Sequence, residues 1–304
     1  MKFTPALTLA AALLCPTYAL AINAVMYQPQ LRDMSMTDQQ WKNILGQLKQ
    51  QGIDTLVFQW SRYGDAFNGG EPQHWLENKA MLVKDSGLKL VMGLAADDKF
   101  FERQNQPLSA LENYFNGLRA RDAELAARWK RVLGEENIAG WYISSELDDR
   151  RWRSPEMQQA ALAWLTKTHE SLAAVADKPI AVSSFFAGNM SPDGYQKWVT
   201  TLSHSGVKVW VQDGAGTGVM TPQARALYLQ TNSGGQVIEL FRQDKNATGF
   251  SATPLDSSEQ RRLLDTRPPA GKDRVYFSLR YMGAAAGILQ YRNSPPVNIE
   301  AGKQ

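Results

Sequence analysis

Two glutamates stand at the ends of apolar segments, where a carboxyl group is costly to bury. Glu146 follows the largely apolar segment 138–145, and Glu239 lies inside the apolar segment 236–241. Burial without a cationic partner raises the pKa of a carboxyl group, which then keeps its proton at neutral pH. One protonated and one ionised carboxyl group suffice to cleave a glycosidic bond: one protonates the leaving oxygen, and the other attacks the anomeric carbon or activates water. We therefore take both glutamates as candidate catalytic residues.

Each glutamate also has a purely structural interpretation. Glu146 could be a loop carboxylate that is solvated at the rim or pairs with an arginine, and Glu239 could form a salt bridge. Interior ion pairs of the second kind do occur in barrels. The arginines in question are Arg150 and Arg151 for Glu146, and Arg242 and Arg280 for Glu239.

Polar and aromatic residues also gather where other apolar segments end. Gln212 and Asp213 open a glycine-rich turn, and they can hydrogen-bond sugar hydroxyls or orient a catalytic glutamate. A structural alternative for Asp213 is that it merely starts the turn. Aromatic rings pack against the apolar C–H faces of sugars, and Tyr27, Trp60, Tyr63, Tyr142, Trp152, Phe185, Phe186 and Tyr281 are the aromatic residues near these ends. Our candidates for substrate binding are Gln28, Gln59, Trp60, Asp148, Gln212, Asp213 and Tyr281.

Other catalytic chemistries lack candidates in the sequence. The three histidines show no metal-ligand spacing, and the lysines of the apolar segments stand near the segment starts rather than the ends. No serine at a segment end has a histidine partner, and the glycines of 213–218 lack the lysine of a phosphate loop. We therefore expect neither a metal nor a cofactor. The residues considered are His74, His169, His204, Lys89, Lys208, Ser144, Ser145 and Ser184.

Eight short apolar segments form the framework that must position these side chains. Helical patterns separate almost all of them, and their starts lie 28 to 49 residues apart, close to the roughly 30 residues of a βαβ unit. Apolar strands alternating with helices favour a parallel sheet, and eight such units favour a closed (β/α)8 barrel, an α/β fold whose active face lies at the C-terminal ends of the strands. The predicted strands are 24–28, 55–60, 89–95, 138–145, 179–185, 207–212, 236–241 and 274–279.

Capping residues mark where the helices begin. A Ser or Thr before a Pro is typical of a helix start, and the sequence has three such pairs, Ser154-Pro155, Ser191-Pro192 and Thr221-Pro222. Thr37 is a further predicted cap, and Ser257 with Gln260 matches a capping box. The longest insertion, 96–136, predicts a charged loop followed by a long helix.

The N-terminus has the features of a secretory signal. Lys2 precedes a short apolar run that ends near the small-residue site Ala19-Leu20-Ala21, so we expect cleavage near Ala21 and export to the periplasm or the medium. Cys15 is the only cysteine, and cleavage of the signal peptide would remove it. We expect a signal peptide at 1–21, one barrel domain at 22–293 and a polar tail at 294–304. The net charge is +3 and the sequence has no basic block, so we expect no nucleic-acid partner. We also expect no membrane span in the mature chain, and a monomer.

Three motifs resemble a bacterial family of glycoside-hydrolase-like barrels long described as a domain of unknown function. They are Gly140-Trp-Tyr through Glu146 and Asp148, Gln212-Asp213-Gly-x-Gly216, and Glu239-Leu-Phe241. The family is similar in layout to the retaining (β/α)8 glycosidases, which place the acid/base at the end of the fourth strand and the nucleophile at the end of the seventh. The resemblance implies Glu146 as acid/base and Glu239 as nucleophile. The chain departs from that clan in having Ser145 where Asn usually precedes the acid/base.

We therefore expect an exported glycoside hydrolase that cleaves within the chains of a bacterial envelope or extracellular polysaccharide, so that its partner is a polysaccharide or oligosaccharide substrate. The alternative from another class is a non-catalytic glycan-binding barrel that assists polysaccharide synthesis or export. A lyase or isomerase acting on uronic acids is a third expectation, and its unsaturated product would absorb ultraviolet light.

Overall fold

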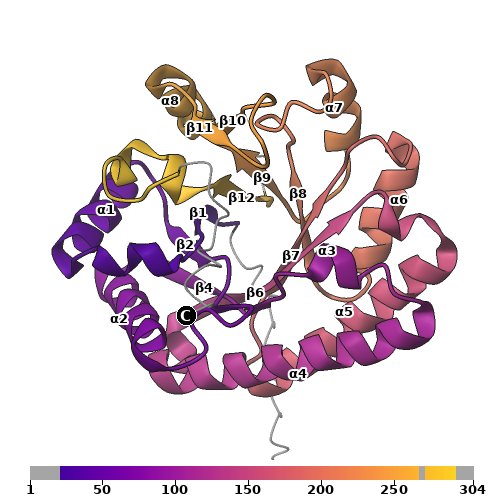
Figure 1. The fold of residues 1–304 in the computed structure, drawn as a ribbon, viewed down its shortest axis with the longest axis horizontal. Coiled ribbons are helices and arrows are strands. Elements are labelled where there is room, and N and C mark those ends of the chain that lie inside the picture. The colour runs from indigo at the N-terminus through magenta and orange to yellow at the C-terminus, as the bar shows by residue number, and fades with distance from the viewer. Residues whose placement is uncertain (1–20, 267–270, 292–304) are drawn as a thin grey trace, which may run out of the picture.

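Eight parallel strands close into a barrel in the computed structural model, which describes residues 21–266 and 271–291 (Figure 1). The hydrogen-bonded order around the barrel is β1-β12-β9-β8-β7-β6-β4-β2, and each pair of neighbours is parallel. The prediction of a (β/α)8 barrel is confirmed. The strands are β1 Asn23–Tyr27, β2 Thr55–Phe58, β4 Lys89–Gly93, β6 Ile138–Asp148, β7 Ile180–Phe185, β8 Lys208–Gln212, β9 Gly235–Glu239 and β12 Asp273–Phe277.

Helices surround the barrel as an outer layer (Figure 1). They are α1 Asp38–Gln50, α2 Gly70–Ser86, α3 Phe100–Arg103, α4 Leu108–Leu133, α5 Pro155–Val175, α6 Pro192–Ser203, α7 Pro222–Leu229 and α8 Ser257–Asp265. None of those within residues 21–266 and 271–291 is both long and apolar enough to cross a membrane. The predicted tail, and all of the predicted signal peptide except Ala21, lie outside the described residues, as do the last two residues of the predicted barrel domain.

Short strands and 3-10 turns are the remaining elements of the described residues. Two pairs of short strands lie outside the barrel sheet, β3 Arg62–Tyr63 with β5 Ala95–Ala96, and β10 Phe241–Gln243 with β11 Ala252–Pro254. The 3-10 turns are η1 Leu31–Ser35, η2 Glu135–Asn137, η3 Arg151–Arg153, η4 Leu279–Tyr281 and η5 Gly283–Ala285.

Four of the predicted helix caps are confirmed, and the predicted capping box is wrong. The side chains of Thr37, Ser154, Ser191 and Thr221 each accept a hydrogen bond from a backbone N–H in the first turn. The predicted capping box of Ser257 and Gln260 is wrong, because Asp256 caps α8 instead. Its carboxylate accepts from the N–H groups of Ser258 and Glu259, both at 2.8 Å, and an ionised carboxylate is the stronger acceptor.

The insertion 96–136 contains the predicted long helix, α4, and in the segment before it the short helix α3, which the sequence did not predict. On α4, Phe115 stacks on Trp164 of α5 with ring centroids 4.4 Å apart and an interplanar angle of 7°. This contact joins the insertion to the outer layer of helices.

Side chains fill the barrel interior below the mouth. Tyr142 and Trp210 stack across it with centroids 5.5 Å apart, and the Trp210 indole donates to Asp273 at 3.0 Å. Small and branched residues occupy the remaining space: Ala24, Met26, Val57, Val91, Ala181, Val237 and Val275. A packed interior of this kind restricts open space to the strand ends.

Gly93 provides a test of how closely the strands pack. A Cβ atom there would lie 2.2 Å from the carbonyl oxygen of Phe58 and 2.3 Å from the backbone of Gln59. We expect Gly93→Ala to lower the free energy of unfolding by about 1–3 kcal/mol or more, because backbone atoms must move. Gly46→Ala is the matched control, since no atom lies within 4 Å of its Cβ position and Ala favours the helix by about 1 kcal/mol. Urea denaturation of both variants measures the difference, and equal stabilities would contradict this packing.

Candidate active site

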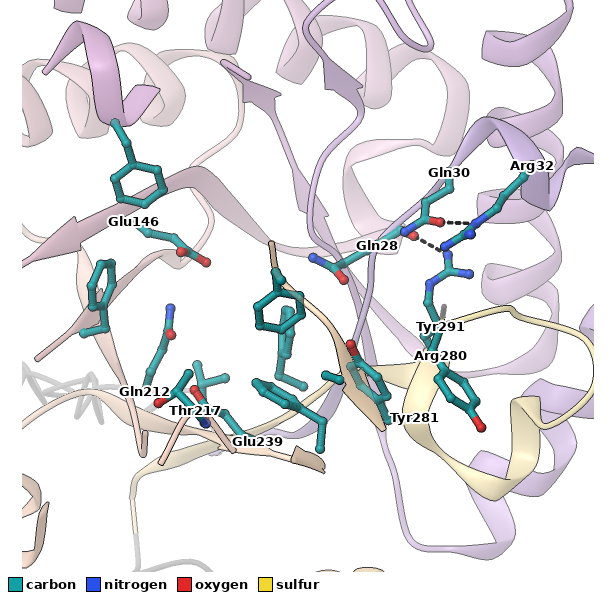
Figure 2. A pocket seen from close by; sticks show the side chains of 17 residues that line it. Gln28, Gln30, Arg32, Glu146, Gln212, Thr217, Glu239, Arg280, Tyr281 and Tyr291 are labelled. Carbon is teal, nitrogen blue, oxygen red and sulfur yellow. Dashed lines mark hydrogen bonds between the residues drawn. The ribbon is translucent and has the colours of Figure 1, made fainter. Parts of the chain in front are cut away.

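A cavity of about 450 Å³ opens at the C-terminal ends of the strands, and both Glu146 and Glu239 line it (Figure 2). Gln28, Gln212 and Tyr281, three of the predicted substrate-binding residues, also line this cavity. Five residues that the sequence placed at a common mouth are thus brought together by five different strands or the turns that follow them.

Glu146 projects into the cavity from β6. The pairing of β6 with β7 shifts register between Ile143 and Glu146, and Tyr142, which precedes this shift, points into the barrel interior below the carboxyl group. Glu146 is half-buried. Burial raises the pKa of its carboxyl group, and a hydrogen bond from the Gln212 side chain opposes that rise.

The ion-pair interpretation of Glu146 finds no support in the described part of the chain, where no salt bridge includes this residue. The guanidinium of Arg151 instead donates to the carbonyl oxygens of Gln104 at 2.5 Å and Gln106 at 2.9 Å. Glu146 is therefore held by neutral groups and keeps an unneutralised carboxyl group at the cavity.

Glu239 is the last residue of β9 and is held by the backbone of the glycine-rich turn. Its Oε2 accepts hydrogen bonds from the N–H groups of Gly216 at 2.6 Å and Thr217 at 3.2 Å. A Cβ atom on Gly216 would lie 2.7 Å from the Phe241 ring and carbonyl, so only glycine lets this turn approach. The turn thus fixes one carboxylate oxygen of Glu239.

The surroundings of Glu239 raise its pKa to about 7. Burial is the main cause, the charge of Asp213 is the next, and the charge of Glu146 adds to them, while the two backbone hydrogen bonds act in the opposite direction. The charge of Glu146 thus acts on Glu239, and both carboxyl groups line the same cavity. Sequence reasoning had also offered Arg242 and Arg280 as partners of Glu239, but Arg242 pairs with Glu259 and Arg280 with Asp33.

Asp213 lies behind Glu239 rather than on the cavity wall. Its Oδ1 accepts from the N–H groups of Ala215 at 3.0 Å and Glu239 at 3.3 Å, and burial raises the pKa of its carboxyl group. Asp213 therefore starts the turn and also positions Glu239, which unites the two interpretations that the sequence left open.

Three other predicted substrate-binding residues do not line the cavity. The Trp60 indole donates to the carbonyl oxygen of Pro29 at 2.9 Å, and its ring packs on Tyr63. Asp148 accepts from the Arg150 N–H at 2.8 Å and from the Gln104 side chain at 3.0 Å, so it organises the loop after β6. Gln59 is buried, and its Oε1 has no hydrogen-bond partner.

Two aromatic walls flank the glutamates. The sequence did not indicate that these rings lie together. Phe101 of α3 contacts Phe185 edge-on, with ring centroids 6.1 Å apart. On the other wall, Tyr281 lies 5.3 Å from Phe241 and 5.9 Å from Tyr291, measured between ring centroids. Phe101 and Tyr291 are exposed, which suits rings that contact a ligand rather than the core.

Further residues that line the cavity are not among the predicted catalytic or substrate-binding residues. They are Gln30, Arg32, Thr217, Val237, Phe250, Ala252, Phe277 and Arg280. Most lie in turns whose path the strand pattern does not predict. Among residues 21–266 and 271–291, no cluster of three His, Cys, Asp or Glu side chains is arranged to hold a metal ion.

The raised pKa of Glu239 predicts a pH-dependent stability. Its ordinary value is 4.5 and the folded value is about 7, so its ionisation destabilises the folded state increasingly from pH 4.5 to 7. The full cost, about 3 kcal/mol, is present above pH 7 and absent below pH 4.5. We expect Glu239→Gln to unfold at higher urea concentration than the unaltered protein at pH 8, and at the same concentration near pH 4. Glu170→Gln, at an exposed helix position, is the control, and a difference independent of pH would contradict the burial of this charge.

Comparison with known proteins finds a family and a relative that are similar to this chain in sequence. A profile of the family described as "Domain of unknown function (DUF4434)" matches residues 22–285. The protein named "Uncharacterized protein YbcH" of Escherichia coli (strain K12) is 44% identical over 287 residues, covering 92% of this chain and 96% of that protein.

A solved structure named as a putative glycosidase shares the barrel fold. A putative alpha-L-fucosidase from Bacteroides thetaiotaomicron VPI-5482 superposes with a TM-score of 0.62 at 15% identity, covering 95% of this chain and 95% of the other. The catalytic domain of a beta-amylase from Paenibacillus polymyxa has a TM-score of 0.48 at 12% identity, covering 90% of this chain and 98% of the other. Identities this low show a likeness of fold alone.

Proposed function

The chain belongs to the DUF4434 family, and we propose that it is a glycoside hydrolase in which Glu146 and Glu239 are the two catalytic carboxyl groups. One observation carries the proposal. Two carboxyl groups from separate strands face one cavity, they interact electrostatically, and neither has an arginine or lysine partner in the described part of the chain. Such a pair is the minimal machinery of glycosidic bond cleavage.

The hydrogen bonds around the pair support a division of roles. Two backbone N–H groups on Oε2 of Glu239 stabilise its ionised form, and Oε1 is left for the anomeric carbon. Glu146, whose pKa burial raises, holds the proton that the leaving oxygen receives. Because two nearby carboxyl groups do not both ionise cheaply, the ionised state of one favours the protonated state of the other.

The cleavage follows the retaining course that the family layout implies. Glu239 attacks the anomeric carbon as Glu146 protonates the departing oxygen, and the glycosidic bond breaks. Glu146, now ionised, takes a proton from water, and this water releases the sugar from Glu239. Gln212 keeps Glu146 oriented through both steps because it hydrogen-bonds its carboxyl group.

The substrate class follows from the cavity walls and the N-terminal sequence. Aromatic rings on both sides of the glutamates provide stacking surfaces for sugars on both sides of the cleaved bond. This supports cleavage within a polysaccharide rather than at its end. The predicted signal peptide supports export to the periplasm or the medium, where envelope and extracellular polysaccharides occur.

Digestion of isolated polysaccharides tests the proposal. Purified protein is incubated with envelope and extracellular polysaccharide fractions, and new reducing ends are counted while mass spectrometry identifies fragments. We expect fragments of several sugars with intact reducing ends. Fragments with an unsaturated sugar that absorbs ultraviolet light would instead indicate a lyase. Binding of a fraction without any new ends would indicate a glycan-binding barrel.

A further inference from the structure

Two arginines, Arg32 and Arg280, line one side of the active-site cavity, and a buried carboxylate pairs with one of them. The Arg280 guanidinium donates to both oxygens of Asp33, at 2.7 and 3.1 Å, and both residues are buried. Arg280 also donates to the carbonyl oxygens of Gln28 and Gln290. The charge of Arg280 is thus fully matched by Asp33.

Arg32 is the second cation, and within residues 21–266 and 271–291 no salt bridge includes it. Its Nε donates to Gln30 Oε1 at 2.5 Å, and one terminal nitrogen donates to the Gln290 carbonyl oxygen at 3.2 Å. Both acceptors are neutral. Burial and the charge of Arg280 lower the pKa of the Arg32 guanidinium, and the charge of Asp33 opposes that fall. Arg32, Arg280 and Asp33 together leave one positive charge in excess among the described residues at this side of the cavity.

Figure 2 shows where this excess charge lies relative to the glutamates. Arg32 and Arg280 occupy the side of the pocket opposite Glu146, with Tyr281 nearer the middle. Arg32 and Arg280 are the only cationic side chains among the cavity-lining residues that the structure describes. A ligand that spans the cavity therefore contacts acidic groups at one side and an unmatched guanidinium at the other.

We propose that the cavity recognises a sugar bearing an acidic group, and that Arg32 binds this group. The acidic group is a carboxylate, a sulfate or a phosphate, for which the planar guanidinium is a suited donor. The inference deepens the proposed hydrolase function and rests on it for the nature of the ligand. An anionic sugar placed beside Glu146 and Glu239 would be repelled, so binding requires the cation to lie at the far side, as Arg32 does.

A second feature fits an anionic ligand here. Arg32 is half-buried and lines the cavity, and the hydrogen bond from its Nε to Gln30 fixes the plane of its guanidinium. Gln30 is itself buried and held by η1. A donor that is already oriented loses little conformational entropy on binding.

The test uses Glu146→Gln protein, labelled with a fluorophore, on an array of defined oligosaccharides. The array carries uronic acid, sulfated and phosphorylated oligosaccharides beside neutral ones of the same backbones, which separates the three sources of negative charge. Arg32→Gln and Arg32→Lys are compared in the same Glu146→Gln background. Arg131→Gln, at an exposed site on α4 outside the cavity, is the matched control.

We expect binding to one acidic class above its neutral counterpart, and an affinity at least about tenfold lower after Arg32→Gln. Arg32→Lys should keep part of the affinity, since it keeps the charge, and Arg131→Gln should keep all of it. Equal binding of neutral and acidic sugars, or equal affinities of Arg32→Gln and Arg131→Gln, would overturn the inference.

The outcome also separates this inference from the proposed function. If the unaltered protein cleaves neutral polysaccharides only, the hydrolase stands and the acidic-sugar inference falls. If acidic sugars bind through Arg32 but are never cleaved, the hydrolase falls and the recognition stands. Binding to no sugar of either kind overturns both.

Discussion

Glu146→Gln is expected to lower kcat/KM for polysaccharide cleavage by about 10²–10⁴-fold. The amide has the size of the carboxyl group but has no acidic proton to give to the leaving oxygen. Burial raises the pKa of Glu146, so the variant should be at least as stable as the unaltered protein at neutral pH. Reducing-end assays on the polysaccharide fraction that the protein cleaves measure the loss.

Glu112→Gln is the matched control for this loss. Glu112 lies on α4 with a side chain that is 70% exposed, outside the cavity, so its substitution should leave kcat/KM unchanged. The pH profile adds a second readout, because removal of the acid should abolish the alkaline fall in kcat/KM. Cleavage by Glu146→Gln at the unaltered rate would remove Glu146 from the mechanism.

Asp33→Asn is expected to lower the free energy of unfolding by about 3–5 kcal/mol, because it leaves Arg280 buried without a counter-charge. Asp33 binds Arg280 through both oxygens and also accepts hydrogen bonds from the Tyr27 hydroxyl and the Gln30 N–H. These contacts join the turns after β1 and β12. Urea denaturation at neutral pH measures the loss.

Asp65→Asn is the control for the buried pair. Asp65 has a side chain that is 97% exposed and lies 3.9 Å from Arg62, and exposed pairs of this kind contribute about 0–1 kcal/mol. A double variant with Asp33→Asn and Arg280→Gln should recover part of the lost stability, since it removes the unpaired charge. A loss of less than about 1 kcal/mol for Asp33→Asn would show that the pair is not buried as described.

The barrel framework and the two glutamates could be predicted from the sequence because both depend on local sequence patterns. The apolar strands, the helix starts at Ser154, Ser191 and Thr221, and the placement of Glu146 and Glu239 at the ends of apolar segments all depend on residues near in sequence. A carboxyl group at the end of an apolar segment interrupts the apolar pattern, and this interruption indicates a functional residue.

The other parts of the site depend on side-chain direction and on distant contacts. Trp60 stands beside a strand end, yet its indole turns to the Pro29 carbonyl, a partner that periodicity does not reveal. Arg280 was a candidate partner of Glu239, but it pairs with Asp33, 247 residues earlier. The role of Asp213 was open for the same reason, since only the closed barrel brings its carboxylate to the Glu239 N–H.

The most direct test of the catalytic role of the two carboxyl groups is the digestion of one polysaccharide. The unaltered protein, Glu146→Gln and Glu239→Gln are compared, and mass spectrometry identifies the products. We expect the unaltered protein to release fragments whose masses include the added water, while both variants remain folded and release at least about 100-fold less. Fragments from both variants in amounts equal to those of the unaltered protein, or fragments that lack this water, would contradict this expectation.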